Sequence, residues 1–162
     1  MQINTAEKFT LDNAAQVFIY EKEFYPLSNF SAFQLYWYGR HFMTSEHAYQ
    51  WMKFRDAETS LAIESARSAH EAFKIAESNR HLVVPNWTNM RVTVMRNILW
   101  AKVEQHEYVK RKLLETGDRE IIEESWRDDF WGWGPNRDGQ NMLGRLWMEI
   151  RQEIARSVRS IC

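Results

Sequence analysis

The amino-acid sequence predicts an α+β fold: a helix-rich single domain with a small, mostly antiparallel sheet. Two observations support this class. Short runs of β-branched and aromatic residues gather in the first third of the chain, whereas apolar stripes at helical spacing occupy the remainder. The chain has 162 residues, the size of one ordinary domain, and its three Pro and six Gly form no linker. We therefore expect one domain over residues 1–162, with the first ~15 residues uncertain.

Most of the predicted strands lie near the N-terminus. Residues 17–20, 33–38 and 41–43 are short β-prone runs, and Gly39 with Arg40 is the expected turn between the last two. Residues 24–30 include Pro, Ser and Asn and therefore indicate a loop. A further short strand is expected around Ile121 and Ile122.

Helices are predicted from residue 45 onward. The first has Thr44 or Ser45 as its N-cap and ends near Asp56, and a second covers residues 57–66. Ser68 and Glu71 have the spacing of a capping box, which starts a helix that continues to about residue 77.

The second half of the chain contains the longest helices. One begins near Asn86, because apolar residues follow one helical stripe from there, and the helical pattern resumes over residues 108–114 after a break near His106. Gly117 ends this region. Residues 126–140 indicate a loop, and a last helix runs from Asn141, a favourable N-cap residue, to about residue 158.

Charge and composition limit the function. The chain has 21 Lys and Arg against 22 Asp and Glu, a net charge of -1, so it does not bind nucleic acid mainly by neutralising phosphates. A nucleotide would have to be held in a local pocket, and eight Trp offer flat faces for stacking. The single Cys, Cys162, allows no internal disulfide, and no signal peptide or membrane span is visible, so a cytoplasmic protein is expected.

Three segments could carry chemistry, and the first follows Ser45. On a helix at about 100° per residue, Glu46, Gln50 and Lys53 fall within roughly 60° of one another. In a pocket, Glu46 could activate water or stabilise positive charge on a sugar, and Lys53 could serve as a cation or an amine nucleophile. The alternative is a solvated helix face with a Glu-to-Gln contact.

The second segment is the expected loop around Asp129, Trp131 and Gly132. Glycine allows backbone N–H groups to approach a ligand closely, and a helix N-terminus at Asn141 favours an anion such as phosphate. A tight structural loop, with Asn141 as a mere N-cap, is an equally good interpretation.

The third segment is the loop with Ser28, Asn29 and Phe30, taken together with Trp87. A loop Asn can bind the edge of a base or a ribose hydroxyl, although Asn in such loops more often forms a turn. Trp87 is either a stacking platform or part of the core. His41 and His47 match no common zinc pattern, so neither a metal nor another cofactor is expected.

Together these segments resemble the YbiA-like, or NADAR, family. The resemblance spans roughly residues 24–152 and appears in family order, in the stretches Leu27-Ser28-Asn29-Phe30, Thr44-Ser45-Glu46-His47 through Gln50, Lys53-Phe54, Val94-Met95, Thr116-Gly117-Asp118, Ile122-Glu123-Glu124-Ser125, Phe130-Trp131-Gly132 and Gln140-Asn141-x-Leu143-Gly144. Two segments depart from the family pattern: residues 82–88 lack its Arg and acidic residue beside Trp87, and residues 135–137 replace a Gly-rich loop. Both changes concern the substrate rim.

The resemblance implies a YbiA-like fold and metal-independent hydrolysis of N-glycosidic bonds. Its members act on ADP-ribose attached to guanine or on a phosphoribosylamino-pyrimidine intermediate of riboflavin synthesis. It also implies a nucleotide-type substrate, which includes ADP-ribosylated DNA or a guanine nucleotide. The implied site residues are Asn29, Glu46, Lys53, Asp129, Trp131, Gly132 and Asn141.

Three functions remain open on this basis. The leading function is removal of ADP-ribose from guanine. The first alternative is cleavage of the riboflavin intermediate. The second alternative is a binding module for ADP-ribose or an NAD-derived ligand, without turnover. Glu46, Lys53 and Asp129 are the expected catalytic residues. The expected substrate-binding residues are Ser28, Asn29, Phe30, Gln50, Trp87, Trp131, Gly132 and Asn141.

Overall fold

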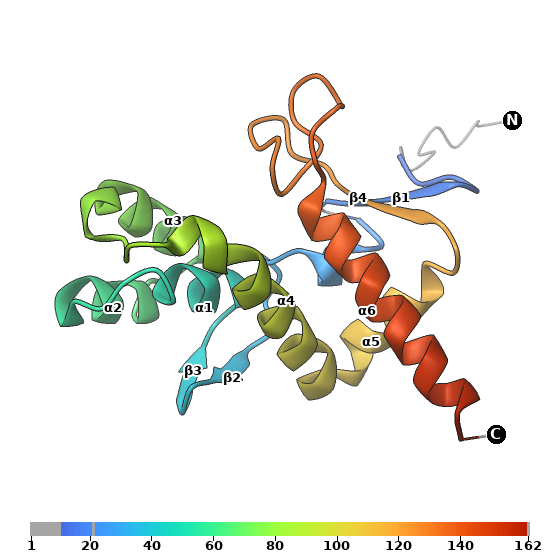
Figure 1. Cartoon of the computed structure of the whole chain (residues 1–162), viewed down its shortest axis with the longest axis horizontal. Coiled ribbons are helices and arrows are strands. Elements are labelled where there is room, and N and C mark those ends of the chain that lie inside the picture. Colours follow the sequence, from blue (N-terminus) through green and yellow to red (C-terminus); the bar gives the residue numbers. More distant parts are fainter. Residues whose placement is uncertain (1–10, 21, 162) are drawn as a thin grey trace, which may run out of the picture.

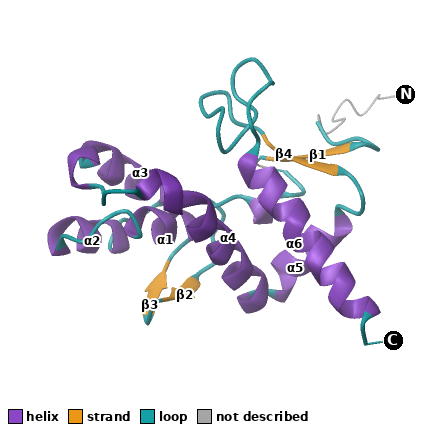
Figure 2. Ribbon diagram, in the orientation of Figure 1, coloured by secondary structure: helices purple, strands orange, loops and turns teal. Residues whose placement is uncertain are grey.

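Helices dominate the structure, a computed structural model that describes residues 11–20 and 22–161. In those residues, six α-helices pack around two separate two-stranded sheets (Figure 1; Figure 2). The α+β class is confirmed. The first three helices form one end of the molecule, while the last two helices and the parallel strand pair form the other, and the longest helix runs between them (Figure 1).

The expectation of one mostly antiparallel sheet is corrected. Strands β2 (Leu35–Trp37) and β3 (Arg40–Phe42) form an antiparallel hairpin, but β1 (Gln16–Ile19) pairs in parallel with the distant β4 (Glu120–Glu123). The last three residues of β1 are all buried, as is typical of a parallel strand covered on both faces. A sequence pattern places such a strand but does not show its distant partner.

The hairpin turn lies one residue earlier than predicted. Tyr38 and Gly39 both have positive φ values, of 48° and 75°, and they form the two-residue connection between β2 and β3. Two left-handed residues suit the twist of a tight hairpin. Arg40 is therefore the first residue of β3 rather than part of the turn.

Helix α1 (Ser45–Trp51) is shorter than predicted. Thr44 is its N-cap and accepts a hydrogen bond from the His47 backbone N–H, as expected, but the helix ends five residues before Asp56. The chain turns because Phe54 is buried in a second hydrophobic cluster, beside Ile63. Asp56 then becomes the N-cap of the next helix, with its carboxylate accepting the Thr59 N–H.

The next two helices follow the predicted pattern closely. Helix α2 spans Ala57–Glu64 and α3 spans Ala69–Ser78. Ser68 caps α3 and accepts from the Glu71 N–H, which confirms the predicted helix start. Two short 3-10 turns, Tyr25–Leu27 and Arg80–Leu82, complete this part of the chain.

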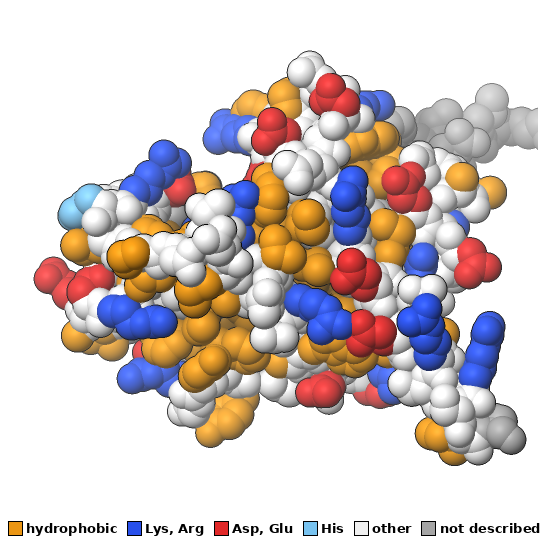
Figure 3. Space-filling view, in the orientation of Figure 1, with side chains coloured by type: hydrophobic (Ala, Val, Ile, Leu, Met, Phe, Trp, Pro, Cys, Tyr) orange, Lys and Arg blue, Asp and Glu red, His pale blue; other side chains and the backbone are white. Residues whose placement is uncertain are grey.

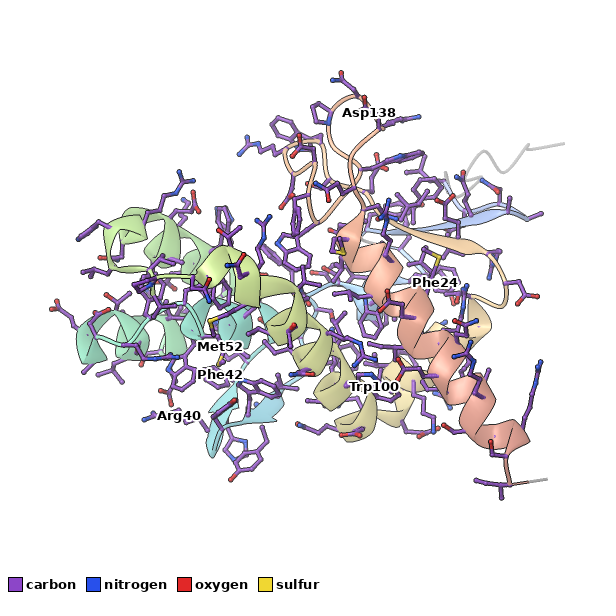
Figure 4. All side chains as sticks on the ribbon, in the orientation of Figure 1. Phe24, Arg40, Phe42, Met52, Trp100 and Asp138 are labelled. Carbon is purple, nitrogen blue, oxygen red and sulfur yellow. The ribbon has the colours of Figure 1, made fainter. Side chains whose placement is uncertain are left out.

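The longest helix, α4 (Trp87–Gln105), is followed directly by α5 (Glu107–Glu115), with the predicted break at His106. Gly117 has a φ of 60°, which suits its predicted place after the end of α5. Helix α4 contacts α1, β2, α5 and α6 and therefore forms the centre of the fold. Figure 4 shows Phe42 and Met52 in the region where β3, α1 and α4 meet.

The last helix, α6 (Met142–Arg159), lies against β4. A Cβ atom on Gly144 would lie 2.0 Å from the Ile121 carbonyl oxygen, so only glycine permits this approach. Trp147 is completely buried on the same helix and donates its indole N–H to the Leu27 carbonyl. No helix in the described residues is long and apolar enough to cross a membrane.

Candidate functional site

Glu46, in the first turn of α1, is a buried carboxylate with a relative exposure of only 6%. Its Oε1 accepts a hydrogen bond from Gln50 Nε2 at 2.6 Å, one helical turn later. Burial raises the pKa of Glu46, and the charge of Asp128 raises it further, whereas the Gln50 hydrogen bond and Lys53 lower it. The solvated helix face considered above is therefore excluded, and the carboxylate can act as an acid or a base.

Lys53 lies just beyond α1 rather than on it, which corrects the predicted helix boundary. Its backbone N–H donates to the Gln50 carbonyl, so the chain keeps a helical turn and holds Lys53 on the side of Glu46. The ammonium lies 5.0 Å from the Tyr49 ring centroid and 5.9 Å from that of Trp87. Burial lowers the pKa of Lys53, although the charge of Glu46 opposes this shift. Lys53 forms no salt bridge with any described residue.

Three rings form an aromatic wall beside this pair: Tyr49, Trp87 and Trp131. Tyr49 contacts Trp87 at 5.4 Å between ring centroids and meets Trp131 edge-on at 5.6 Å. The burial of Tyr49 raises its pKa, and the charge of Glu46 raises it further, so the phenol remains protonated. The wall is formed by Tyr49 within α1, Trp87 at the start of α4 and Trp131 in the loop after β4. Lys53 lies beside the first two of these rings.

Two further carboxylates complete an acid cluster with Glu46: Glu123 at the end of β4 and Asp128 in the loop that follows. Burial raises the pKa of Glu123 to about 8, and the charges of Asp128 and Glu46 raise it as well. Its Oε2 atom is buried and has no hydrogen-bond partner among the described residues. Within the described residues, no three His, Cys, Asp or Glu side chains are placed to hold a metal ion.

A completely buried lysine, Lys102, supports this region from α4. Its ammonium donates to the Ser28 carbonyl at 2.8 Å and to the Ser31 hydroxyl at 2.9 Å. Burial lowers the pKa of Lys102 to about 7, while the charge of Glu123 opposes the shift. Lys102 therefore anchors the 28–31 loop to α4, and this loop in turn positions the start of α1.

Asn29 connects that loop to Glu46. Its backbone oxygen accepts the Glu46 N–H at 3.0 Å, and its side-chain Oδ1 accepts the Ser45 hydroxyl. Its amide nitrogen contacts the Met95 sulfur at 3.3 Å, which is a weak acceptor, so an N–H can still bind a ribose hydroxyl. Ser28 accepts the Phe30 N–H and is buried, whereas the Phe30 ring is 40% exposed.

The loop over residues 124–141, here the late loop, arranges its acidic residues differently from the prediction. Asp129 is exposed and lies outside the acid cluster. Asp128 instead accepts the backbone N–H groups of Phe130 and Trp131 and influences the pKa of Glu46. The geometry therefore favours Asp128 over Asp129. Asp138 lies at the outer end of this loop, away from α1 (Figure 4).

Asn141 and Gly132 have structural roles that the sequence did not show. Asn141 occupies the N-cap position of α6 in a left-handed conformation, but its side chain does not cap the helix. It accepts the Glu123 N–H and donates to the Ile121 carbonyl, so both of its polar atoms bind β4 and fix Glu123. Gly132 is buried, and a Cβ there would lie 2.6 Å from the Ser125 Cβ. Both residues thus position the site.

Sequence reasoning missed five residues of this region. Tyr49, Arg91, Glu123, Asp128 and Lys102 were not among the candidates. Helical spacing could have identified two of them, because Tyr49 lies four residues before Lys53 and Arg91 lies four residues after Trp87. The positions of Glu123 and Asp128 depend on long-range pairing and loop geometry, although Glu123 lies in a stretch that resembles the family and Asp128 adjoins the candidate Asp129.

A known protein family and several known proteins match this chain over most of its length. The family described as "NADAR domain" matches residues 17–155. "N-glycosidase YbiA" of Shigella boydii is 35% identical over 128 residues, which cover 79% of this chain and 80% of that protein. "N-glycosidase Npun_R5314" of Nostoc punctiforme is 33% identical over 130 residues, covering 78% and 83%.

Two other relatives extend the comparison. "Riboflavin biosynthesis protein VVA0006" of Vibrio vulnificus is 36% identical over 128 residues, 79% of this chain but 35% of that longer protein. The NMR structure of Escherichia coli YbiA matches with a TM-score of 0.80 and 29% identity, covering 97% of this chain and 95% of that one. The chain belongs to the NADAR domain family, whose members include enzymes that are N-glycosidases.

Proposed function

We propose that the chain hydrolyses N-glycosidic bonds without a metal and that its substrate is ADP-ribose attached to guanine. The observation that carries this proposal is the pair of the buried Glu46 and the half-buried Lys53, which lie together beside the aromatic wall. A module that only binds its ligand does not need a buried carboxylate and an amine with a lowered pKa at one place. We also propose that the protein is located in the cytoplasm.

Glu46 is proposed to stabilise the cation at ribose C1 and to activate water. Breaking a ribosyl C–N bond develops oxocarbenium character at C1, and a nearby carboxylate lowers the energy of that state. Because burial raises the pKa of Glu46, its carboxyl group takes up a proton more readily than an exposed glutamate and is suited to proton transfer. The negative charge that acts on Glu46 is that of Asp128, whereas Glu123, with its pKa raised to about 8, is mostly neutral near pH 7.

Lys53 is proposed to act as the nucleophile on the opened sugar. For a base attached through an exocyclic amine, ring opening leaves a C1 imine, and the Lys53 amine adds to C1. The base then departs with its nitrogen and a proton, which leaves a lysine Schiff base. Water adds to that Schiff base, the C1–lysine bond breaks, and the free sugar and free amine are restored. Desolvation keeps part of Lys53 in the neutral form that this step requires.

The ADP-ribosyl class is favoured by the number of aromatic surfaces. Such a substrate has two flat heterocycles, adenine and guanine. The aromatic wall can hold one of them, and the late loop also presents Trp126, which is 67% exposed. Positive and negative side chains are interspersed on the face shown in Figure 3, so a DNA-linked substrate would be held by local contacts.

A phosphoribosylamino-pyrimidine of riboflavin synthesis is the second candidate substrate. The observation in its favour is the 36% identity to a protein named for riboflavin biosynthesis. This substrate has one heterocycle and one phosphate, so it would use the aromatic wall without Trp126. A binding module for ADP-ribose without turnover is the third candidate.

Product release from both substrates, measured side by side by chromatography, tests the proposal. ADP-ribosylated guanosine and the pyrimidine intermediate are incubated separately with the wild-type chain and with Glu46→Gln. We expect the wild-type chain to release guanosine and Glu46→Gln to release almost none. Release from the pyrimidine alone would assign the second substrate. Tight binding of ADP-ribose without release from either substrate would show a binding module.

A further inference from the structure

Arg91 is an arginine of the site that the mechanism above does not use. It lies one turn after Trp87 on α4, so both side chains project from the same face of the helix. The charge of Arg91 lowers the pKa of Lys53 and that of Tyr49, which places its guanidinium within electrostatic reach of both groups. Arg91 therefore belongs to the same site as the aromatic wall.

The guanidinium of Arg91 is held against the late loop by stacking. Its central carbon lies 3.5 Å from the ring centroid of Phe130, which is van der Waals contact. Phe130 in turn meets Trp131 edge-on at 4.9 Å between centroids. A guanidinium that stacks on a ring is fixed in orientation while the N–H donors at its edge stay available, because all five lie in its plane.

Those donors have no partner in the described residues. No hydrogen bond or salt bridge joins Arg91 to any of them, and its Nε atom is buried without an acceptor. Other half-buried arginines differ: Arg96 pairs with Glu153, and Arg151 donates to Thr116 and to the Arg119 carbonyl. A buried donor without an acceptor is costly, so its presence beside the candidate site points to a ligand that supplies the acceptor.

We propose that Arg91 binds the phosphate attached to the 5′ carbon of the substrate ribose. This inference rests on the proposed hydrolase function, and it concerns a phosphate that both candidate substrates carry on the ribose. A phosphate presents several acceptor oxygens and matches the planar fork of a guanidinium. The acid cluster and Lys53 would then act at C1, while Arg91 holds the opposite end of the same ribose.

Binding of two probes tests the proposal. The probes are ADP-ribose and adenosine, which share the adenine nucleoside and differ by the diphosphate and the terminal ribose, and calorimetry gives their dissociation constants. Arg91→Met keeps an unbranched apolar side chain against Phe130 and removes the donors. We expect it to weaken ADP-ribose binding about 30-fold and adenosine binding less than about twofold. Arg91→Lys, which keeps the charge without the fork, should give an intermediate loss.

Arg111→Met is the matched control. Arg111 also lies over a ring, that of Tyr108 at 5.2 Å, but on α5, outside the site. It should leave both dissociation constants unchanged. Equal losses for ADP-ribose and adenosine with Arg91→Met, or no loss at all, would overturn the proposal. A melting temperature close to that of wild type shows that the variant is folded.

The phosphate proposal and the hydrolase proposal fail in different ways. A wild-type chain that binds ADP-ribose through Arg91 but releases no product would refute the hydrolase and retain the phosphate contact. If the wild-type chain does not bind ADP-ribose, ribose 5-phosphate and ribose replace the two probes. The same selective loss with Arg91→Met would then support the contact for the shorter substrate class, and an equal loss would refute it.

Discussion

The hydrogen bond from Gln50 to Glu46 gives a sharp prediction about pH dependence. It lowers the pKa of a carboxyl group that burial raises. Replacing Gln50 by Met keeps the length of the side chain and removes the donor. The Gln50 Oε1 atom has no partner, so its loss leaves no other group unpaired. The substitution should therefore act mainly through the pKa of Glu46.

The size of the effect follows from the charge of the acceptor. A hydrogen bond to a charged group contributes about 1.5–3 kcal/mol, so its loss should raise the pKa of Glu46 and favour the protonated form about 10- to 150-fold. If the carboxylate form is active, activity is lost as pH falls through this pKa. The acid limb of kcat/KM against pH should therefore move to higher pH.

The assay is a pH profile of kcat/KM for the cleaved substrate, with Gln105→Met as the control. Gln105 is exposed and binds the backbone of Tyr36, on the hairpin. Its replacement should not move the acid limb. If Gln50→Met lowers activity equally at all pH values and the limb stays in place, the proposed role of the Glu46 carboxylate is refuted.

Three further predictions follow from the same geometry. Lys53→Met should abolish borohydride trapping of the substrate, read by mass spectrometry, and a wild-type chain that turns over without ever trapping would refute the covalent step. Burial lowers the pKa of Lys102 to about 7 in the folded chain, whereas its pKa in the unfolded chain is about 10.4. Between these two pH values the unfolded chain binds more protons than the folded chain, so the free energy of unfolding should rise with pH. Lys102→Met should remove about 2 kcal/mol of the stability gained between about pH 8 and about pH 10, measured by urea unfolding; an equal gain in both chains contradicts this. Gly144→Ala should cost at least about 3 kcal/mol, because its Cβ would overlap the Ile121 carbonyl oxygen, and an unchanged midpoint of urea unfolding would show that α6 can move away.

Much of the fold could be predicted because it depends on local patterns. The capping residues Thr44 and Ser68, the apolar stripe of α4 and the break at His106 are properties of neighbouring residues. The pairing of β1 with β4 could not be predicted, because the two strands lie about a hundred residues apart in the chain. Their backbone hydrogen bonds do not depend on the side chains, so the sequence of neither strand indicates its partner.

The site residues also fall into those that local spacing predicts and those whose positions depend on the folded loop. Glu46 and Gln50 were predicted together, because helical spacing alone brings them to one face. Asp129 was chosen from the family resemblance, and the sequence could not show that Asp128 accepts two backbone N–H groups of the late loop and acts on Glu46. Asn141 was expected to cap a helix, but its left-handed conformation directs its amide to β4.

The most direct test of the account is single-turnover cleavage by Glu46→Gln, combined with the dissociation constant of ADP-ribose. Glutamine fills the same space in the buried position but cannot carry the negative charge. We predict a dissociation constant close to that of wild type and a chemical step slowed by at least about a hundredfold. A chemical step within about threefold of the wild-type rate would contradict the central claim that the Glu46 carboxylate drives cleavage of the glycosidic bond.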